Sequence, residues 1–132
     1  MVVTVEDLRF FLKNMPEDFV SDETIEMQID LAEWFISHEK SSQADDESLD
    51  KATLIRAAYF TTLAYMQEAE RALGIVPPSL AALVSELKNL QLAAIEIIKR
   101  GNIYSIPLSL ATLSGSAWDY AGGGSTIKTS TG

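Results

Sequence analysis

The chain has 132 residues, 47% of them hydrophobic, with no cysteine and a net charge of −9. This length suits a single domain, and the apolar content excludes a wholly disordered chain. The absence of cysteine excludes disulfides, thiolate metal sites and cysteine nucleophiles.

The negative charge is concentrated in the first part of the chain. Residues 1–50 hold 14 Asp and Glu against 3 Lys and Arg, a balance of −11, whereas residues 51–132 hold 5 against 7, a balance of +2. An acidic surface repels free nucleic acid, so we expect no sequence-specific or RNA-coating role. A solvated face that promotes solubility is the commoner explanation for such charge.

Neither the N-terminal stretch nor the most apolar stretch of the chain predicts a targeting or membrane segment. The opening MVVTVEDLRFF has acidic residues where a signal peptide requires a basic region. The most apolar stretch, residues 80–98, is interrupted by Glu, Lys, Asn and Gln. We therefore expect no membrane span.

A short first helix is predicted from Thr4 to about Asn14. Thr4 is a suitable N-cap, and Leu8 and Phe11 follow at helical spacing. Pro16 should end the helix, because the residue before a proline is disfavoured in the helical region.

A second helix is predicted after SDET, with Ser21 or Asp22 as its N-cap. It carries two apolar stripes, with Phe35 between them: Ile25, Ile29, Ala32 and Ile36, and then Met27, Leu31 and Trp34. A helix that is apolar on two sides usually lies between two neighbours. These are either two helices of its own chain, or one of its own and one of a partner, so the second stripe is a candidate inter-subunit face.

Two long helices should follow an acidic connector at residues 41–50. The first begins near Leu49 and ends at the C-cap Gly74, and the second begins at Pro78 or Ser79 and runs to Gly101. One face of the first carries Ala52, Ile55, Tyr59, Leu63, Met66 and Leu73.

Beyond Gly101 the pattern changes to a period of two. Ile106, Leu108 and Leu110 alternate with small residues, which predicts an extended arm. Pro107 cannot donate into a central ladder, so the arm should lie at a sheet edge or on a surface.

The last 19 residues, SGSAWDYAGGGSTIKTSTG, are too poor in apolar residues to order themselves. Trp118 and Tyr120 are the exception, and on an extended arm they would face the same way. The tail either folds back or floats, or these two aromatics anchor it on another chain. The sequence thus predicts an all-α bundle of about four helices, two of them long and antiparallel, over residues 1–101, with an extended arm and a flexible Gly/Ser/Thr tail over 102–132.

No pattern of catalytic, cofactor-binding or metal-binding residues stands out. His38 is the only histidine, and no G-x-S-x-G sequence accompanies it. One histidine cannot complete a di-iron bundle site, DDESLD lacks the pattern of a calcium loop, and GGG at 122–124 precedes no helix. We expect no enzyme activity and no cofactor, and an unrecognised carboxylate site is a minor alternative.

The order of these elements resembles that of the head-tail connector, or adaptor, proteins of tailed bacteriophages. The resemblance covers most of the chain and rests on the stretches VTVEDLRFFL, SDETIEMQIDLAEWFI and DKATLIRAAYFTTLAYM, followed by another long helix, an extended segment and a Gly/Ser tail. It implies a ring, commonly of twelve copies, that lies below the portal protein in the virion and is made in the host cytoplasm. Such a ring extends the DNA channel, lets DNA pass without sequence-specific binding, and docks a stopper or tail-completion protein.

A different class of function also fits the charge distribution. A small acidic regulatory or binding module, such as an inhibitor that mimics nucleic acid, would bind a basic host enzyme through the acidic first half of the chain.

Overall fold

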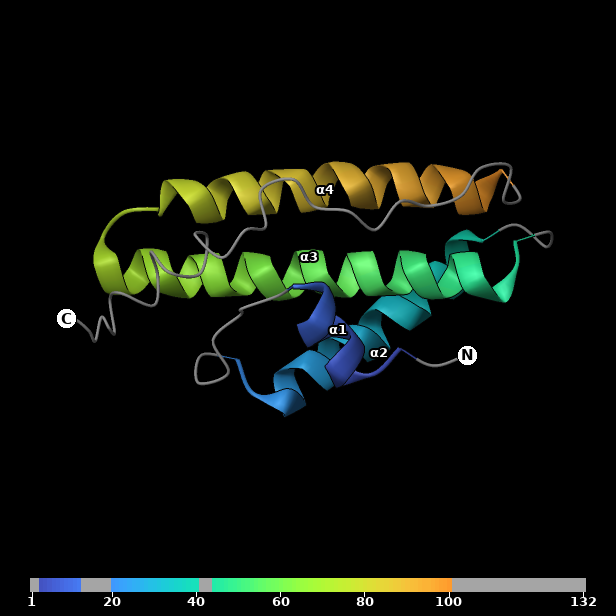
Figure 1. Cartoon of the computed structure of the whole chain (residues 1–132), viewed down its shortest axis with the longest axis horizontal. Coiled ribbons are helices and arrows are strands. Elements are labelled where there is room, and N and C mark those ends of the chain that lie inside the picture. The colour runs from blue at the N-terminus through green and yellow to red at the C-terminus, as the bar shows by residue number, and fades with distance from the viewer. Residues whose placement is uncertain (1–2, 13–19, 41–43, 101–132) are drawn as a thin grey trace.

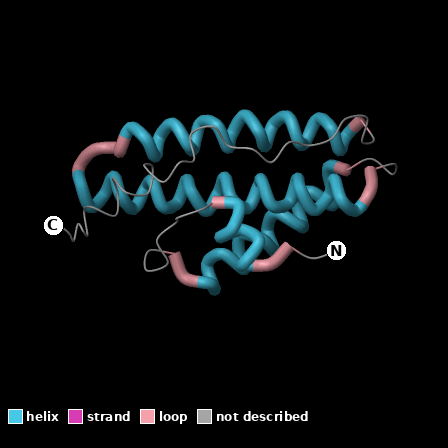
Figure 2. The backbone as a smooth tube through the Cα atoms, in the orientation of Figure 1, coloured by secondary structure: helices cyan, strands magenta, loops and turns pink. Residues whose placement is uncertain are grey.

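The computed structural model describes residues 3–12, 20–40 and 44–100, and these form four helices without a strand (Figure 2). The predicted small all-α bundle is therefore confirmed. The arm residues Ile106, Leu108 and Leu110 and the tail residues Trp118 and Tyr120 lie outside the described residues.

Helices α3 (Asp46–Leu73) and α4 (Pro78–Lys99) form a long antiparallel hairpin (Figure 1). Gly74 ends α3 in the left-handed region, with a φ of 80°, which a residue without a Cβ adopts without strain. Pro78 occupies the first position of α4, where its missing N–H costs no helical hydrogen bond. The predicted turn between the two long helices is confirmed.

Helix α2 (Asp22–Glu39) crosses α3 on the side away from α4, and the short α1 (Val5–Phe11) lies against both α2 and α3 (Figure 1). Helix α3 is therefore the central element, because it packs on α4 along one side and on α2 along the other.

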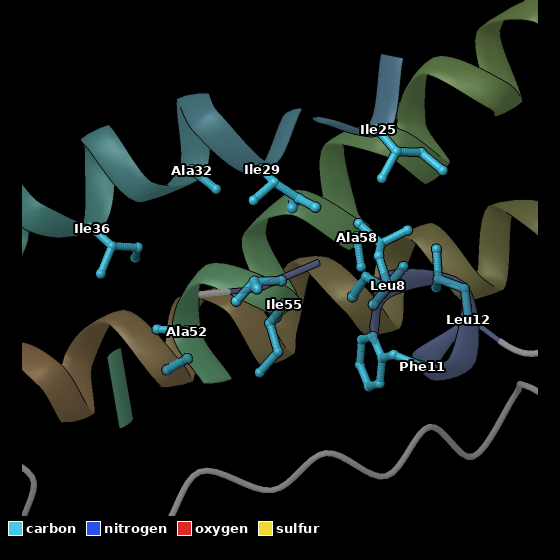
Figure 3. Close-up of a cluster of buried hydrophobic side chains, with 14 of the residues drawn as sticks. Leu8, Phe11, Leu12, Ile25, Ile29, Ala32, Ile36, Ala52, Ile55 and Ala58 are labelled. Carbon is cyan, nitrogen blue, oxygen red and sulfur yellow. The ribbon is translucent and has the colours of Figure 1, made fainter. Parts of the chain in front are cut away.

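The core between α1, α2 and α3 is built from the predicted first stripe of α2. Its four residues meet α1 and α3 side chains in one cluster (Figure 3), labelled as Leu8, Phe11, Leu12, Ile25, Ile29, Ala32, Ile36, Ala52, Ile55 and Ala58. A second set of fully buried leucines and an isoleucine from α4 completes the core: Leu80, Leu83, Leu87 and Ile98. Each such side chain contributes about 1.5–3 kcal/mol through removal from water.

The two N-terminal helices are joined by polar contacts as well as by the core. Thr4 caps α1 in a reciprocal capping box with Asp7. From α1, Arg9 Nη2 donates to Asp22 Oδ1 and to the Val20 carbonyl oxygen, both at 2.8 Å. Since Asp22 begins α2, this one guanidinium holds the first turn of α2 against α1.

Three predicted details need correction. Helix α1 ends at Phe11 with Leu12 as its C-cap, before the expected Asn14. Helix α3 begins at Asp46 rather than near Leu49, because Asp45 caps it and the acidic connector supplies its favourable first turn.

The third correction concerns the buried surface of α3. The predicted single face underestimates it, since Ala57, Thr61 and Tyr65 are also buried, whereas Leu73 is exposed. The cause is the central position of α3, which places neighbours on two of its sides.

Candidate interaction face

The second stripe of α2 lies in solvent. Met27, Leu31 and Trp34 are 53%, 56% and 64% exposed, and their spacing of four and then three residues places them on one side of the helix. We call these three residues the α2 strip. Large apolar side chains gathered on one helix face are the usual sign of an interaction site.

The strip is exposed because α2 packs on the bundle through its opposite side. Ile25, Ile29 and Ile36 are each at most 4% exposed and contact α1 and α3 (Figure 3). Within the described ranges, no element lies over the opposite side of the helix. Helices α1 and α3 are both neighbours of α2, but they cover its first stripe, and no described element covers the second stripe.

The Trp34 end of the strip is held by local contacts. The Trp34 and His38 rings lie 4.3 Å apart between centroids. His38 Nδ1 and Ser37 Oγ are both 2.7 Å from the Trp34 carbonyl oxygen. Because a carbonyl only accepts, Nδ1 carries the proton in this contact. His38 lies in the last turn of α2, and it supports the indole.

A groove runs from the strip toward α3. It has a volume of about 250 Å³ and is lined by Gln28, Leu31, Ala32, Trp34 and Phe35 of α2 and by Arg56 and Phe60 of α3. We call it the α2–α3 groove. It shares Leu31 and Trp34 with the strip, so the two features form one continuous face.

Among the described residues, Arg56 is the one charged residue that lines this groove. Its guanidinium carbon lies 3.4 Å from the centroid of the Phe35 ring and 4.7 Å from that of Phe60, so the cation makes cation–π contacts with both rings. Nη1 donates to Oε1 of Gln91, a buried residue of α4. A single side chain therefore connects α2, α3 and α4.

Arg56 remains a cation in this setting. Burial lowers the pKa of its guanidinium from its ordinary value, and nearby Glu39 offsets part of that effect. An arginine stays protonated at neutral pH after such a change. The groove consequently presents one positive charge in an aromatic surround, a combination that suits a carboxylate flanked by apolar groups.

A second, acidic groove of about 480 Å³ lies between the start of α1 and α2. Its carboxylates are Glu6, Asp22, Glu26 and Asp30. No group of three or more acidic or histidine side chains among the described residues is arranged to hold a metal ion.

The structure brings together the three predicted residues of the inter-subunit face, whereas the five predicted arm and tail residues lie outside its described part. Arg56 and Phe60 were missed as parts of this face. Their spacing of four residues on one helix was a readable signal, but their approach to Phe35 depends on how α2 crosses α3.

No protein-family model, curated protein or solved structure matches the chain. None of the helices in the described ranges combines the length and apolar character of a membrane span.

Proposed function

We propose that this chain is a structural virion protein of the head-tail connector, or adaptor, type. In this role it forms a ring below the portal protein, extends the DNA channel and docks a stopper or tail-completion protein. The proposal comes from the resemblance of the chain to that class, and one structural observation carries the assembly part of it. That observation is the exposure of the α2 strip.

A ring accounts for an apolar strip on one side of a small bundle. In a head-to-tail ring, one surface of each copy contacts a different surface of the next, so every copy covers its neighbour's exposed strip. Met27, Leu31 and Trp34 put three large apolar side chains on one helix face, and removing them from water favours association.

The charge of α2 is compatible with a DNA channel nearby. The helix carries six carboxylates and no Lys or Arg. If such a surface faces a bore, DNA moves past it without adhering, because like charges repel. The ring would therefore guide DNA without recognising its sequence.

The C-terminal segment supplies the second contact in this proposal. Ile106, Leu108 and Leu110 form an alternating apolar set, and Trp118 and Tyr120 are large anchors in a polar surround. These C-terminal residues would bind the portal, the neighbouring copy or the tail component. All three of these partners belong to the assembled virion.

The test is to mix the purified full chain with rings of the portal protein encoded nearest to it. We expect co-sedimentation of several copies of the chain with each portal ring. A chain that stays apart from the portal rings would exclude a connector role.

The acidic groove favours one alternative. Four carboxylates line it, as expected for a module that imitates nucleic acid and inhibits a basic host enzyme. A pull-down from host lysate distinguishes the two functions, since a mimic retains a basic enzyme and releases it as the salt concentration rises.

A further inference from the structure

We propose that the α2–α3 groove binds the segment Trp118–Asp119–Tyr120 of a second copy of this chain. The inference rests on the proposed function, because it requires a neighbouring copy against the α2 strip. It specifies which part of that neighbour occupies the groove.

The size of the groove favours a peptide segment over a small-molecule ligand. Its volume of about 250 Å³ lies below the roughly 300–1,000 Å³ of pockets that enclose such ligands. Side chains that enter from a neighbouring chain need less volume, because the rest of the segment stays outside. The described residues that line it are largely aromatic or aliphatic, with Arg56 as the single cation among them.

The C-terminal segment has the complementary composition. Among residues 101–132, Asp119 is the single acidic residue, and it stands between the two aromatic residues Trp118 and Tyr120. Arginine pairs with carboxylates through directed, charge-assisted hydrogen bonds, and aromatic side chains bury large areas with few rotors to restrict. The segment therefore offers one acid and two aromatics to a groove whose described lining holds one cation and two aromatic rings beside it.

The end of α4 places the start of the segment on the correct side of the bundle. Lys99 Nζ lies 3.3 Å from Glu39 Oε1, so α4 ends beside the last turn of α2. The 17 residues between Arg100 and Trp118 reach at most about 60 Å when extended. Since the 18 residues of α2 span only about 27 Å, this length exceeds the whole α2 face and leaves enough chain to cross to a copy packed against it.

A second copy would cover more of the exposed apolar surface, the α2 strip together with the groove, than the tail of the same chain would. A three-residue segment in the groove would leave the far end of the strip, at Met27, in solvent. A neighbour that covers Met27 with its body lies next to the groove, because the groove shares Leu31 and Trp34 with the strip, and this brings the groove within reach of its C-terminal segment. The second contact then forms within an existing complex, which strengthens both contacts.

The absence of cysteine permits a direct test in the full chain. One variant carries Gln28→Cys at the groove, and another carries Ala121→Cys beside the segment. The two are mixed under mild oxidation, where a disulfide forms only if the Cα atoms come within about 7 Å. The matched control replaces Gln28→Cys with Ser85→Cys, an exposed position on α4.

We expect the groove pair to form a covalent dimer at least tenfold faster than the control pair. Adding Asp119→Lys to the Ala121→Cys chain should reduce that rate to the control level, and Asp119→Asn should reduce it less. Equal rates for the groove and control pairs would overturn the proposal. So would a single chain with both Gln28→Cys and Ala121→Cys that forms only an internal disulfide.

The cross-linking result and the portal result are independent. A rapid, Asp119-dependent cross-link without portal binding would retain the docking and exclude the virion role. Portal binding without the cross-link would retain the virion role and exclude the docking of the segment in the groove.

Discussion

The guanidinium of Arg56 lies 3.4 Å from the ring centroid of Phe35, and this contact joins the central helix α3 to α2 at the edge of the exposed face. The same guanidinium donates to Gln91 on α4. The residue that gives the groove its charge therefore also holds three helices in their relative positions.

Removing the Arg56 side chain should destabilise the fold. We expect Arg56→Ala to lower the free energy of unfolding by about 2 kcal/mol, because it loses the stacking on two rings and the bond to a buried amide. Arg56→Lys keeps the charge without the planar stacked face and should recover only part of this loss. Urea unfolding followed by circular dichroism measures both, and an Arg56→Ala chain as stable as the parent would contradict the assigned contacts.

Two threonines in the middle of α3 should be replaceable with a gain in stability. Thr61 and Thr62 are fully buried, and their hydroxyl oxygens have no hydrogen-bond partner in the described part of the chain. Valine has nearly the same shape without the desolvated hydroxyl. We expect Thr61→Val and Thr62→Val each to raise the free energy of unfolding by about 1 kcal/mol.

Thr4 is the matched control for those substitutions. Its hydroxyl oxygen accepts from the Asp7 amide, so Thr4→Ala should lower stability by about 1 kcal/mol. Chemical unfolding of the three variants gives the comparison. A loss of stability in both valine variants would show that the buried hydroxyls are hydrogen-bonded.

Asp50 should make stability depend on pH. Burial, together with repulsion from Asp46 and Glu33, raises the pKa of Asp50 above 3.8. A carboxyl whose pKa is raised on folding stabilises the fold below its unfolded pKa, and this contribution is lost as the pH rises through the folded value.

Asn at this position imitates the protonated acid. We therefore expect Asp50→Asn to exceed the parent in stability by a few tenths of a kcal/mol near pH 7, a small effect because Asp50 is partly solvated. The stabilities of the parent and of Asp50→Asn should converge below about pH 3.8, the ordinary pKa of an aspartate side chain. Thermal melts across this range test the sign, and a parent more stable than Asp50→Asn at neutral pH would refute it.

The two tail aromatics should contribute to assembly and not to the fold of the bundle. Trp118→Ala combined with Tyr120→Ala should leave the helical circular dichroism unchanged. It should weaken self-association at least tenfold, because buried aromatic anchors typically contribute about 2 kcal/mol or more each. Loss of helical signal would instead place both residues in the core of the single chain.

Local signals in the sequence predicted much of the fold. Thr4 and Ser21 as N-caps, Gly74 as a C-cap and Pro78 at a first helical position each depend on chemistry within a few residues. The periodicity of α2 also separated its buried stripe from its exposed one. The start of α3 was misplaced because an acidic connector and an acidic first turn have the same composition.

What the sequence could not show depends on contacts between helices. Nothing local indicates that α3 lies between α2 and α4, or that Arg56 meets Phe35 and Gln91. These contacts follow from the way the helices cross, which is decided by the packing of the whole core. The strip residues Met27, Leu31 and Trp34 were identified beforehand because surplus apolar periodicity is visible without knowledge of the neighbours.

The most direct test of the account is the mass of the full chain in solution, measured by sedimentation over a range of concentrations. We predict a mass above the monomer value of 14.5 kDa that rises with concentration. Leu31→Asp should return it to 14.5 kDa, whereas Leu92→Asp, at an equally exposed leucine of α4, should not. A parent chain that stays at 14.5 kDa at every concentration, alone and with portal rings, would contradict the claim that the α2 strip is a contact between subunits.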